Sequence, residues 1–372
     1  MGASTDPRTT QESSLLEGVV PFPPEFARRY REKGYWRDRS LADEFATVFE
    51  RYAGRVALID RDARVTYAEL DRVSERLALN LLDAGLAPLD RVVVQLPNVA
   101  EFVYLYFALQ KIGCIPIAAL VTHRFLEMSQ FAKLSGASAC VTPDRYGDFD
   151  FTEMVGRVRR EIPAVKLGIV LGEAPEGFLS LAELISRRPK QPVEALRKLR
   201  IDPSDPAIFQ LSGGTTGVPK LIPRTHNDYA YNSKIAADVC KVTGESVLLL
   251  ALPIAHNMPL ACPGMQGTLF SGGKVVLSAS TRPEDLFRLI QQHRVTHLKV
   301  VPAAARHPER RPAHAARGEA AHPRARPGRV RAGKFRHVGR DALLRSRGGS
   351  GRGAAGDLRA ADFVGRRSET RR

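Results

Sequence analysis

The sequence has few of the residues that stabilise small secreted or metal-binding proteins. Its 372 residues include four cysteines and no C-x-x-C pair: Cys114, Cys140, Cys240 and Cys262. This spacing argues against a zinc site and a disulfide framework. No apolar run is long enough to span a bilayer, and the first residues lack the charged and apolar segments of a signal peptide. We therefore expect a cytoplasmic protein with no membrane partner and no metal-ligating residues.

Acidic residues are scarce in the last fifth of the chain. Residues 303–372 hold 19 Lys and Arg against 6 Asp and Glu, whereas residues 1–302 hold 37 against 34. The net charge of +16 therefore comes mostly from the end of the chain. Only 8 of these 70 residues are Val, Leu, Ile, Met, Phe, Tyr, Trp or Cys. Such a segment buries too little apolar surface to offset the entropy of ordering, so we predict a disordered Arg/Ala/Gly-rich tail.

Three interpretations of this tail are open: a basic arm for nucleic acid, a natural flexible tail, and translation in the wrong reading frame. The tail has two aromatic residues, Phe335 and Phe363, and no recognisable nucleic-acid-binding module. A GC-rich gene read out of frame yields abundant Arg, Ala, Gly, Pro and His, and the composition changes abruptly after an expected strand at 297–302. We favour the out-of-frame origin and expect no specific nucleic-acid partner.

Apolar periodicity between residues 56 and 302 predicts strands and helices in alternation. Strands are expected at 56–60, 64–66, 91–96, 114–120, 137–142, 165–171 and 206–210. Helices are expected at 67–85, 99–112, 124–134, 227–241 and 283–293. This alternation implies an α/β fold with mixed or parallel sheets flanked by helices. We predict a flexible N-terminus over 1–20 and a partial domain over 21–302, with 172–205 as a surface excursion.

Residues 211–220 read L-S-G-G-T-T-G-V-P-K and follow the apolar run at 206–210. Glycines adopt backbone angles closed to other residues, so successive N–H groups can surround an anion. An ordinary surface turn also contains Gly, Ser and Thr, but a gapless string of this length favours a polyphosphate-binding loop. The candidate phosphate-binding residues are Ser212, Gly213, Gly214, Thr215, Thr216, Gly217 and Lys220.

This string resembles the phosphate loop of the adenylate-forming enzymes, the acyl- and aryl-CoA synthetases and peptide-synthetase adenylation domains. Two other strings, V-T-Y-A-E-L at 65–70 and F-A-L-Q-K-I-G-C-I-P at 107–116, are similar to core segments of that family. The resemblance covers about residues 20–302. It implies the N-terminal part of the large domain of such an enzyme, with ATP and Mg²⁺ as cofactors.

The string A-H-N-M-P-L-A-C-P-G at 255–264 resembles the acyl-pocket segment of stand-alone aryl-acid adenylating enzymes of siderophore biosynthesis. By this resemblance the Asn257 amide bonds the carboxylate or 2-hydroxyl of the aryl acid, and His256 lies beside the pocket mouth. Cys262 stands where dihydroxybenzoate enzymes tend to carry serine. Because a thiol is a weak donor, it favours salicylate over 2,3-dihydroxybenzoate. A His–Asn pair could also simply cap a helix, and a lone cysteine could belong to the core.

The resemblance implies a two-step reaction. The aryl acid and ATP form an acyl-adenylate, and the acyl group then passes to the phosphopantetheine thiol of an aryl carrier protein. The family's later motifs bind adenine, ribose and Mg²⁺ and supply a lysine, and we find none of them in residues 303–372. We therefore expect an inactive fragment and assign no catalytic residue. The alternatives are an acyl-CoA synthetase of the same fold and a basic nucleic-acid-binding protein acting through 303–372.

Overall fold

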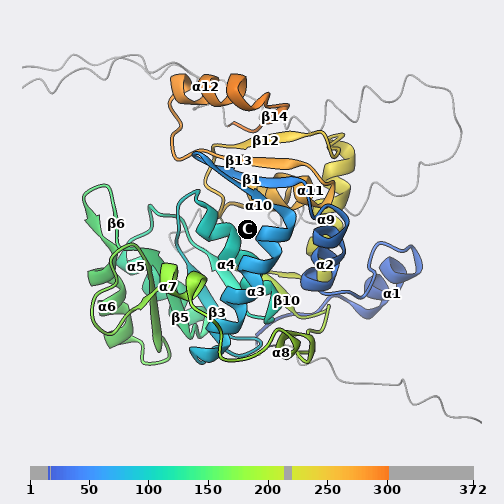
Figure 1. The fold of residues 1–372 in the computed structure, drawn as a ribbon. Helices are drawn as coiled ribbons and strands as arrows, with labels where there is room; N and C mark the ends of the chain where they lie inside the picture. The colour runs from blue at the N-terminus through green and yellow to red at the C-terminus, as the bar shows by residue number, and fades with distance from the viewer. Residues whose placement is uncertain (1–15, 17, 213–219, 301–372) are drawn as a thin grey trace, which may run out of the picture. The chain divides into compact units, whose positions relative to one another are not determined.

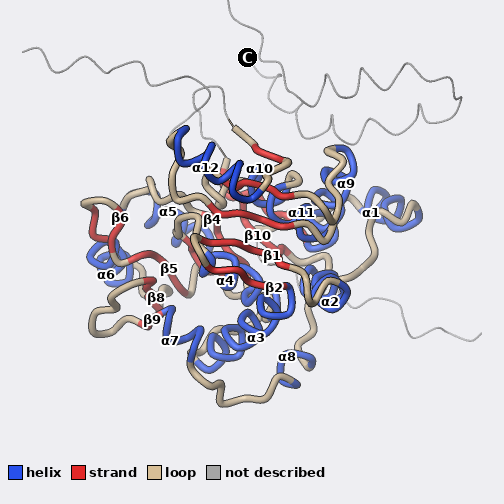
Figure 2. The backbone as a smooth tube through the Cα atoms, turned by 45° about the horizontal axis from the view of Figure 1, so that its top comes forward, coloured by secondary structure: helices blue, strands red, loops and turns tan. Residues whose placement is uncertain are grey.

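The computed structural model describes residues 16, 18–212 and 220–300, which form two large sheets with helices packed against them (Figures 1 and 2). The predicted α/β class is confirmed, with parallel and antiparallel strand pairs in both sheets. The predicted tail at 303–372 lies outside the described residues, as does most of the predicted flexible N-terminus. None of the helices described is long and apolar enough to cross a membrane.

The larger sheet has seven strands in the order β11–β10–β4–β3–β5–β8–β9. All neighbours are parallel except β10 and β11, which run antiparallel on either side of residues 212–220. The strands are β3 (Arg91–Val94), β4 (Ile115–Ala118), β5 (Ala139–Pro143), β8 (Leu167–Leu171), β9 (Leu179–Ser180), β10 (Pro206–Leu211) and β11 (Leu221–Thr225).

Helices cover both faces of this sheet. In β3, Val92 and Val94 belong to one apolar cluster and Val93 to another, as expected when side chains alternate across a fully buried strand. The first cluster includes residues of α3 (Tyr67–Asp83) and α4 (Ala100–Lys111), and the second includes residues of α5 (Phe125–Ser135) and α6 (Phe151–Glu161).

Helix α3 begins at a capping box formed by Thr66 and Glu69, which the sequence contains as a T-x-x-E string. The Glu69 backbone N–H donates to Thr66 Oγ1 at 3.2 Å, and the Thr66 N–H donates back to Glu69 Oε2 at 2.8 Å. Two backbone donors that the helix itself leaves unpaired are thus satisfied.

The second sheet has five strands in the order β14–β12–β13–β1–β2, and only β1 and β2 run antiparallel. Its strands are β1 (Val56–Asp60), β2 (Ala63–Thr66), β12 (Val247–Leu250), β13 (Lys274–Leu277) and β14 (His297–Leu298). Helices α11 (Gly264–Phe270) and α12 (Pro283–His293) contact this sheet. The chain also forms α1 (Pro24–Glu32), α2 (Leu41–Arg51), α9 (His226–Val239) and α10 (Asn257–Ala261), and α9 contacts β10 and β11 of the larger sheet.

The prediction of a surface excursion over 172–205 is wrong for part of that segment. Strand β9 is the edge strand of the seven-stranded sheet, and α7 (Leu181–Ser186) buries Leu181 and Leu184. Helix α8 (Glu194–Arg197) follows, and none of its residues is buried. Helix α6 and the small hairpin of β6 (Arg145–Tyr146) and β7 (Phe149–Asp150) were also not predicted. Strands β6, β7 and β9 have two residues each and α7 has six, so these elements are too short to show a clear apolar period.

Candidate functional site

The predicted phosphate-binding segment is held closed at its two ends. The Ser212 N–H donates to the Lys220 carbonyl oxygen at 3.0 Å, and the Lys220 N–H donates to Ser212 Oγ at 2.8 Å. These bonds continue the antiparallel pairing of β10 and β11, so the chain leaves and re-enters the sheet at one point. Lys220 is exposed. The other candidates in this segment, Gly213, Gly214, Thr215, Thr216 and Gly217, lie outside the described residues.

The second predicted segment forms α10. His256 occupies the N-cap position of this helix, but its side chain makes no capping hydrogen bond and is exposed. The simple capping role considered for this residue therefore lacks a bond to support it. Asn257 is the first residue of α10, and Cys262 is its C-cap. Both side chains are partly buried and form hydrogen bonds with residues of the neighbouring helix α9.

Four hydrogen bonds connect β10 to α10 through α9. Gln210 Nε2 donates to Tyr229 Oη at 3.2 Å, and Tyr229 Oη donates to Asn257 Oδ1 at 3.0 Å. Asn257 Nδ2 then donates to Cys262 Sγ at 3.3 Å, and Cys262 Sγ donates to Asn232 Oδ1 at 2.9 Å. We call these five residues the amide–thiol relay. It joins the strand that enters the predicted phosphate-binding segment to two of the three predicted aryl-acid residues, Asn257 and Cys262, and does not include His256.

The relay fixes which way the Asn257 amide points. Its carbonyl oxygen accepts from Tyr229, and one amide hydrogen goes to Cys262. An amide nitrogen carries two hydrogens, so a second donor is left for a ligand oxygen. Burial raises the pKa of the Cys262 thiol, which keeps it protonated. Its proton is directed at Asn232, so Cys262 is suited to shape a pocket and poorly suited to act as a nucleophile.

Lys299 holds the other end of α10. Its Nζ donates to the Met258 carbonyl oxygen at 3.3 Å and also to the Cys262 carbonyl oxygen. A lysine beside the last carbonyls of a helix satisfies acceptors that the helix leaves unpaired. Burial lowers the pKa of Lys299 to about 8.

Sequence reasoning did not identify Gln210, Tyr229, Asn232 or Lys299. Two local signals could have pointed to them. Gln210 is a polar residue inside an otherwise apolar buried strand, and Tyr229 and Asn232 are three residues apart on α9, which places them on one face. No local signal marks Lys299.

Arg224 and His226, which follow the predicted phosphate-binding segment, have structural roles. Arg224 Nη2 of β11 donates to Asp228 Oδ1 in the first turn of α9 at 3.1 Å. His226 is buried, and its Nδ1 accepts the backbone N–H of Leu41 at 3.1 Å, which ties α9 to α2.

The described residues do not supply a carboxylate set for a metal ion. Within the ranges 18–212 and 220–300, no group of three or more His, Cys, Asp and Glu side chains could hold one. Mg²⁺ prefers oxygen ligands and is usually bound through substrate phosphates together with one or two carboxylates.

The fold and the sequence string at 211–220 are accompanied by a match to the AMP-binding enzymes. Residues 45–346 match the family model described as AMP-binding enzyme, and the chain belongs to this family.

Two of three similar curated proteins are named for aryl acids. The chain is 47% identical over 293 residues to triostin synthetase I of Streptomyces triostinicus, covering 78% of this chain and 53% of the relative. It is 41% identical to the 2,3-dihydroxybenzoate-AMP ligase of Bacillus subtilis, covering 78% and 52%. It is 43% identical to a Streptomyces protein named salicylyl-CoA synthase / salicylate adenylyltransferase, covering 77% and 52%.

A solved structure agrees with these relatives. The apo structure of Mycobacterium smegmatis MbtA superposes with a TM-score of 0.74 at 44% identity, covering 79% of this chain and 54% of that one. The chain spans about half the length of the curated relatives it matches.

Proposed function

We propose that this chain is the ATP- and aryl-acid-binding part of an aryl-acid–AMP ligase of siderophore biosynthesis. Salicylate is the first candidate substrate and 2,3-dihydroxybenzoate the second. The observation that carries this proposal is the amide–thiol relay, because it connects the strand entering the phosphate-binding segment to Asn257 and Cys262. Joining an aryl acid to ATP requires the two reactants to be held in a fixed mutual orientation, and a hydrogen-bonded Asn257 amide is suited to orient the acid.

In the first step the aryl carboxylate oxygen attacks the α-phosphorus of ATP. The new O–P bond forms as the bond to pyrophosphate breaks, giving an acyl-adenylate. Positioning and charge neutralisation dominate such chemistry. The proposed residues for the β- and γ-phosphates are Ser212, Gly213, Gly214, Thr215, Thr216, Gly217 and Lys220. ATP would arrive as its Mg²⁺ complex, and the cation would neutralise phosphate charge.

Asn257 and His256 would act on the acid. The free amide hydrogen of Asn257 would bond the carboxylate or 2-hydroxyl, while Tyr229 prevents the amide from turning over. Exposed His256 would lie at the entrance of the pocket. The acyl group would then pass to the phosphopantetheine thiol of an aryl carrier protein, with AMP as the leaving group.

Cys262 is the proposed selectivity residue. Its thiol proton is directed at Asn232, so the sulfur offers a 3-hydroxyl only a weak acceptor. Salicylate lacks that hydroxyl and loses nothing at this position. Relatives of similar identity are named for each of the two acids, so overall similarity favours neither substrate.

The test uses acyl-sulfamate analogues of the two adenylates, with binding measured by titration calorimetry. We expect the salicyl analogue to bind the 372-residue chain and Asn257→Ala to weaken it by about tenfold, the effect of a lost hydrogen bond to a charged group. Cys262→Ser should improve the dihydroxybenzoyl analogue relative to the salicyl one by about threefold to tenfold.

Cys240→Ser is the matched control, because it makes the same chemical change at an exposed cysteine. Absence of binding to both analogues would contradict the proposed function. An equal change of preference in Cys262→Ser and Cys240→Ser would contradict the selectivity role alone.

The two alternative functions, a nucleic-acid-binding protein and an acyl-CoA synthetase, have less support. A nucleic-acid role depends on residues 303–372, which lie outside the described residues, and residues 303–346 of that segment fall within the family match over 45–346. An acyl-CoA synthetase would share the first step and differ in the thiol that accepts the acyl group. Adding coenzyme A or carrier protein to a complete enzyme of this type would separate the two.

A further inference from the structure

A cavity of about 420 Å³ opens between α2, α9 and the end of α11. None of the described residues that we assign to ATP or the aryl acid lines it. Its volume lies within the range of small-molecule sites. Val48 and Phe270 supply apolar walls, and the remaining lining is rich in charge.

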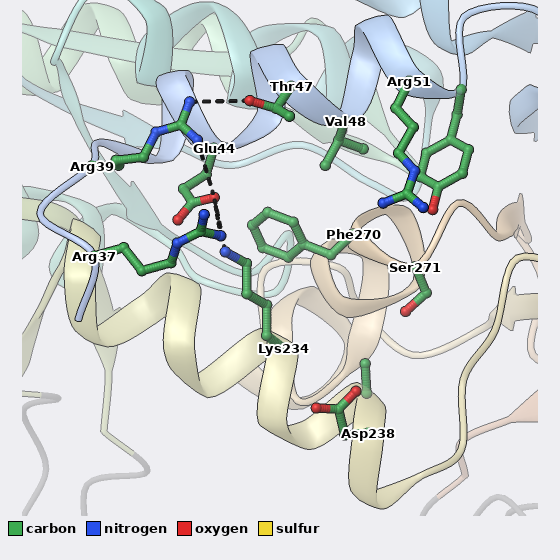
Figure 3. Close-up of a pocket in the computed structure, with 12 residues that line it drawn as sticks. Arg37, Arg39, Glu44, Thr47, Val48, Arg51, Lys234, Asp238, Phe270 and Ser271 are labelled. Atoms are coloured by element: carbon green, nitrogen blue, oxygen red, sulfur yellow. Dashed lines mark hydrogen bonds and ion pairs between the residues drawn. The ribbon is translucent and has the colours of Figure 1, made fainter. Parts of the chain in front are cut away.

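The charges lining this cavity do not balance. Four cations and two carboxylates give a net charge of +2 when all are ionised: Arg37, Arg39, Arg51, Lys234, Glu44 and Asp238. Arg37, Arg39 and Lys234 converge on Glu44, while Arg51 lies on the other side of Phe270 (Figure 3). We call these four cations the cationic ring.

Glu44 organises one side of the ring but neutralises only one of its charges. Its side chain is buried, and Oε2 lies 2.8 Å from Lys234 Nζ, 3.7 Å from Arg37 Nη1 and 4.0 Å from Arg39 Nη1. A salt-bridge network that served only to join α2 to α9 would need one cation for this carboxylate. Three are present, and each additional one repels the others.

Two guanidinium groups are already held in place. Arg39 Nη2 donates to the Asp43 carbonyl oxygen at 2.6 Å and to Thr47 Oγ1 at 3.1 Å. Arg51 lies over the Tyr52 ring, 5.4 Å from its centre, and within the described part of the chain no carboxylate comes within 4.0 Å of it. Guanidinium groups held this way match phosphate oxygens at low entropic cost.

Glu44 does not fully offset the burial of Lys234. Burial lowers the pKa of Lys234, the hydrogen bond to Glu44 opposes that effect, and the nearby charges of Arg37 and Arg39 add to it. A second anion in the cavity would favour the charged form of this lysine and reduce the repulsion within the ring.

We propose that the cationic ring binds a small phosphorylated ligand, separate from the ATP site, with its phosphate groups between Arg51 and the cations around Glu44. The apolar walls would contact the body of the ligand. This inference does not depend on the proposed ligase function, because it uses none of the residues of that site.

Inorganic pyrophosphate is the probe, measured by titration calorimetry at low salt on the 372-residue chain. The predicted loop could also bind it, so Lys220→Gln is included. We expect pyrophosphate binding to persist in Lys220→Gln and to weaken about tenfold in Arg51→Gln. Arg51 is exposed and makes no bond to Glu44, so this variant should fold. Arg28→Gln, at an exposed arginine outside the cavity, is the matched control and should change nothing.

Glu44→Gln gives a test of opposite sign. Removing this carboxylate should tighten pyrophosphate binding by about threefold or more, because it removes a competing anion. Glu44→Gln should also melt at a lower temperature than the parent chain. Adding pyrophosphate should raise the melting temperature of the variant by more than it raises that of the parent. If Lys220→Gln lost pyrophosphate binding and Arg51→Gln bound it as the parent does, the ion would be assigned to the loop and the proposal would be overturned. It would also be overturned by a parent chain that does not bind pyrophosphate, or by a Glu44→Gln variant that binds it more weakly.

Discussion

Replacing Tyr229 with phenylalanine tests whether the amide–thiol relay orients Asn257. Tyr229 is fully buried, and its hydroxyl accepts from Gln210 and donates to Asn257. The change leaves two polar groups without their partner, each at a cost of about 1–3 kcal/mol when buried. Because Asn257 is only partly buried and water can reach it, we expect a total loss of about 2 kcal/mol.

Two assays report the two consequences. For a domain of this size, a loss of about 2 kcal/mol lowers the melting temperature by about 4–8 °C. The Asn257 amide should also lose its fixed orientation, so the salicyl-adenylate analogue should bind about tenfold more weakly. A double-mutant cycle with Asn257→Ala should show that the two changes are not additive in binding, since both act through the same amide.

Tyr106→Phe is the matched control. Tyr106 is also buried, but its hydroxyl has no hydrogen-bond partner among the described residues. Removing it should leave stability unchanged or slightly increased. If Tyr229→Phe were as stable as Tyr106→Phe and bound the analogue as the parent does, the relay would have no role in orienting Asn257.

Three further predictions concern pH, backbone geometry and turnover. Burial lowers the pKa of His226 to about 4. Its pKa in the unfolded chain is about 6.5, so the unfolded state binds more protons below that pH. Stability should fall by about 2 kcal/mol between pH 7 and pH 5, and urea unfolding of His226→Gln should show a smaller fall. Gly264 has a φ of +50°, and a Cβ there would lie 2.2 Å from the Pro259 carbonyl oxygen. Gly264→Ala should therefore cost about 3 kcal/mol in thermal unfolding, whereas Gly54→Ala, with nothing within 4 Å, should cost little. We also expect the 372-residue chain to bind the analogue without exchanging pyrophosphate into ATP, because we find none of the family's later motifs in residues 303–372; exchange at the rate of a complete ligase would contradict this.

The sequence by itself determined the local features of this protein. The capping box at Thr66 and Glu69 and the buried run at 206–210 depend on neighbouring residues, and both are present in the structure. The family was also readable from short strings, because the resemblance is carried by residue identity and needs no knowledge of packing. The helices and strands that were missed, such as β9 and α7, are held in place by the sheet and by α3 and have weak periodicity of their own.

Only the tertiary structure decided which distant segments meet. Strands β1 and β13 are neighbours although more than 200 residues separate them, and nothing in either strand specifies that pairing. The amide–thiol relay joins β10, α9 and α10, and the cationic ring gathers around Glu44 of α2 and Lys234 of α9, so neither could be predicted from local sequence. Periodicity reports which face of an element is buried, whereas the partner across that face depends on the packing of the whole sheet.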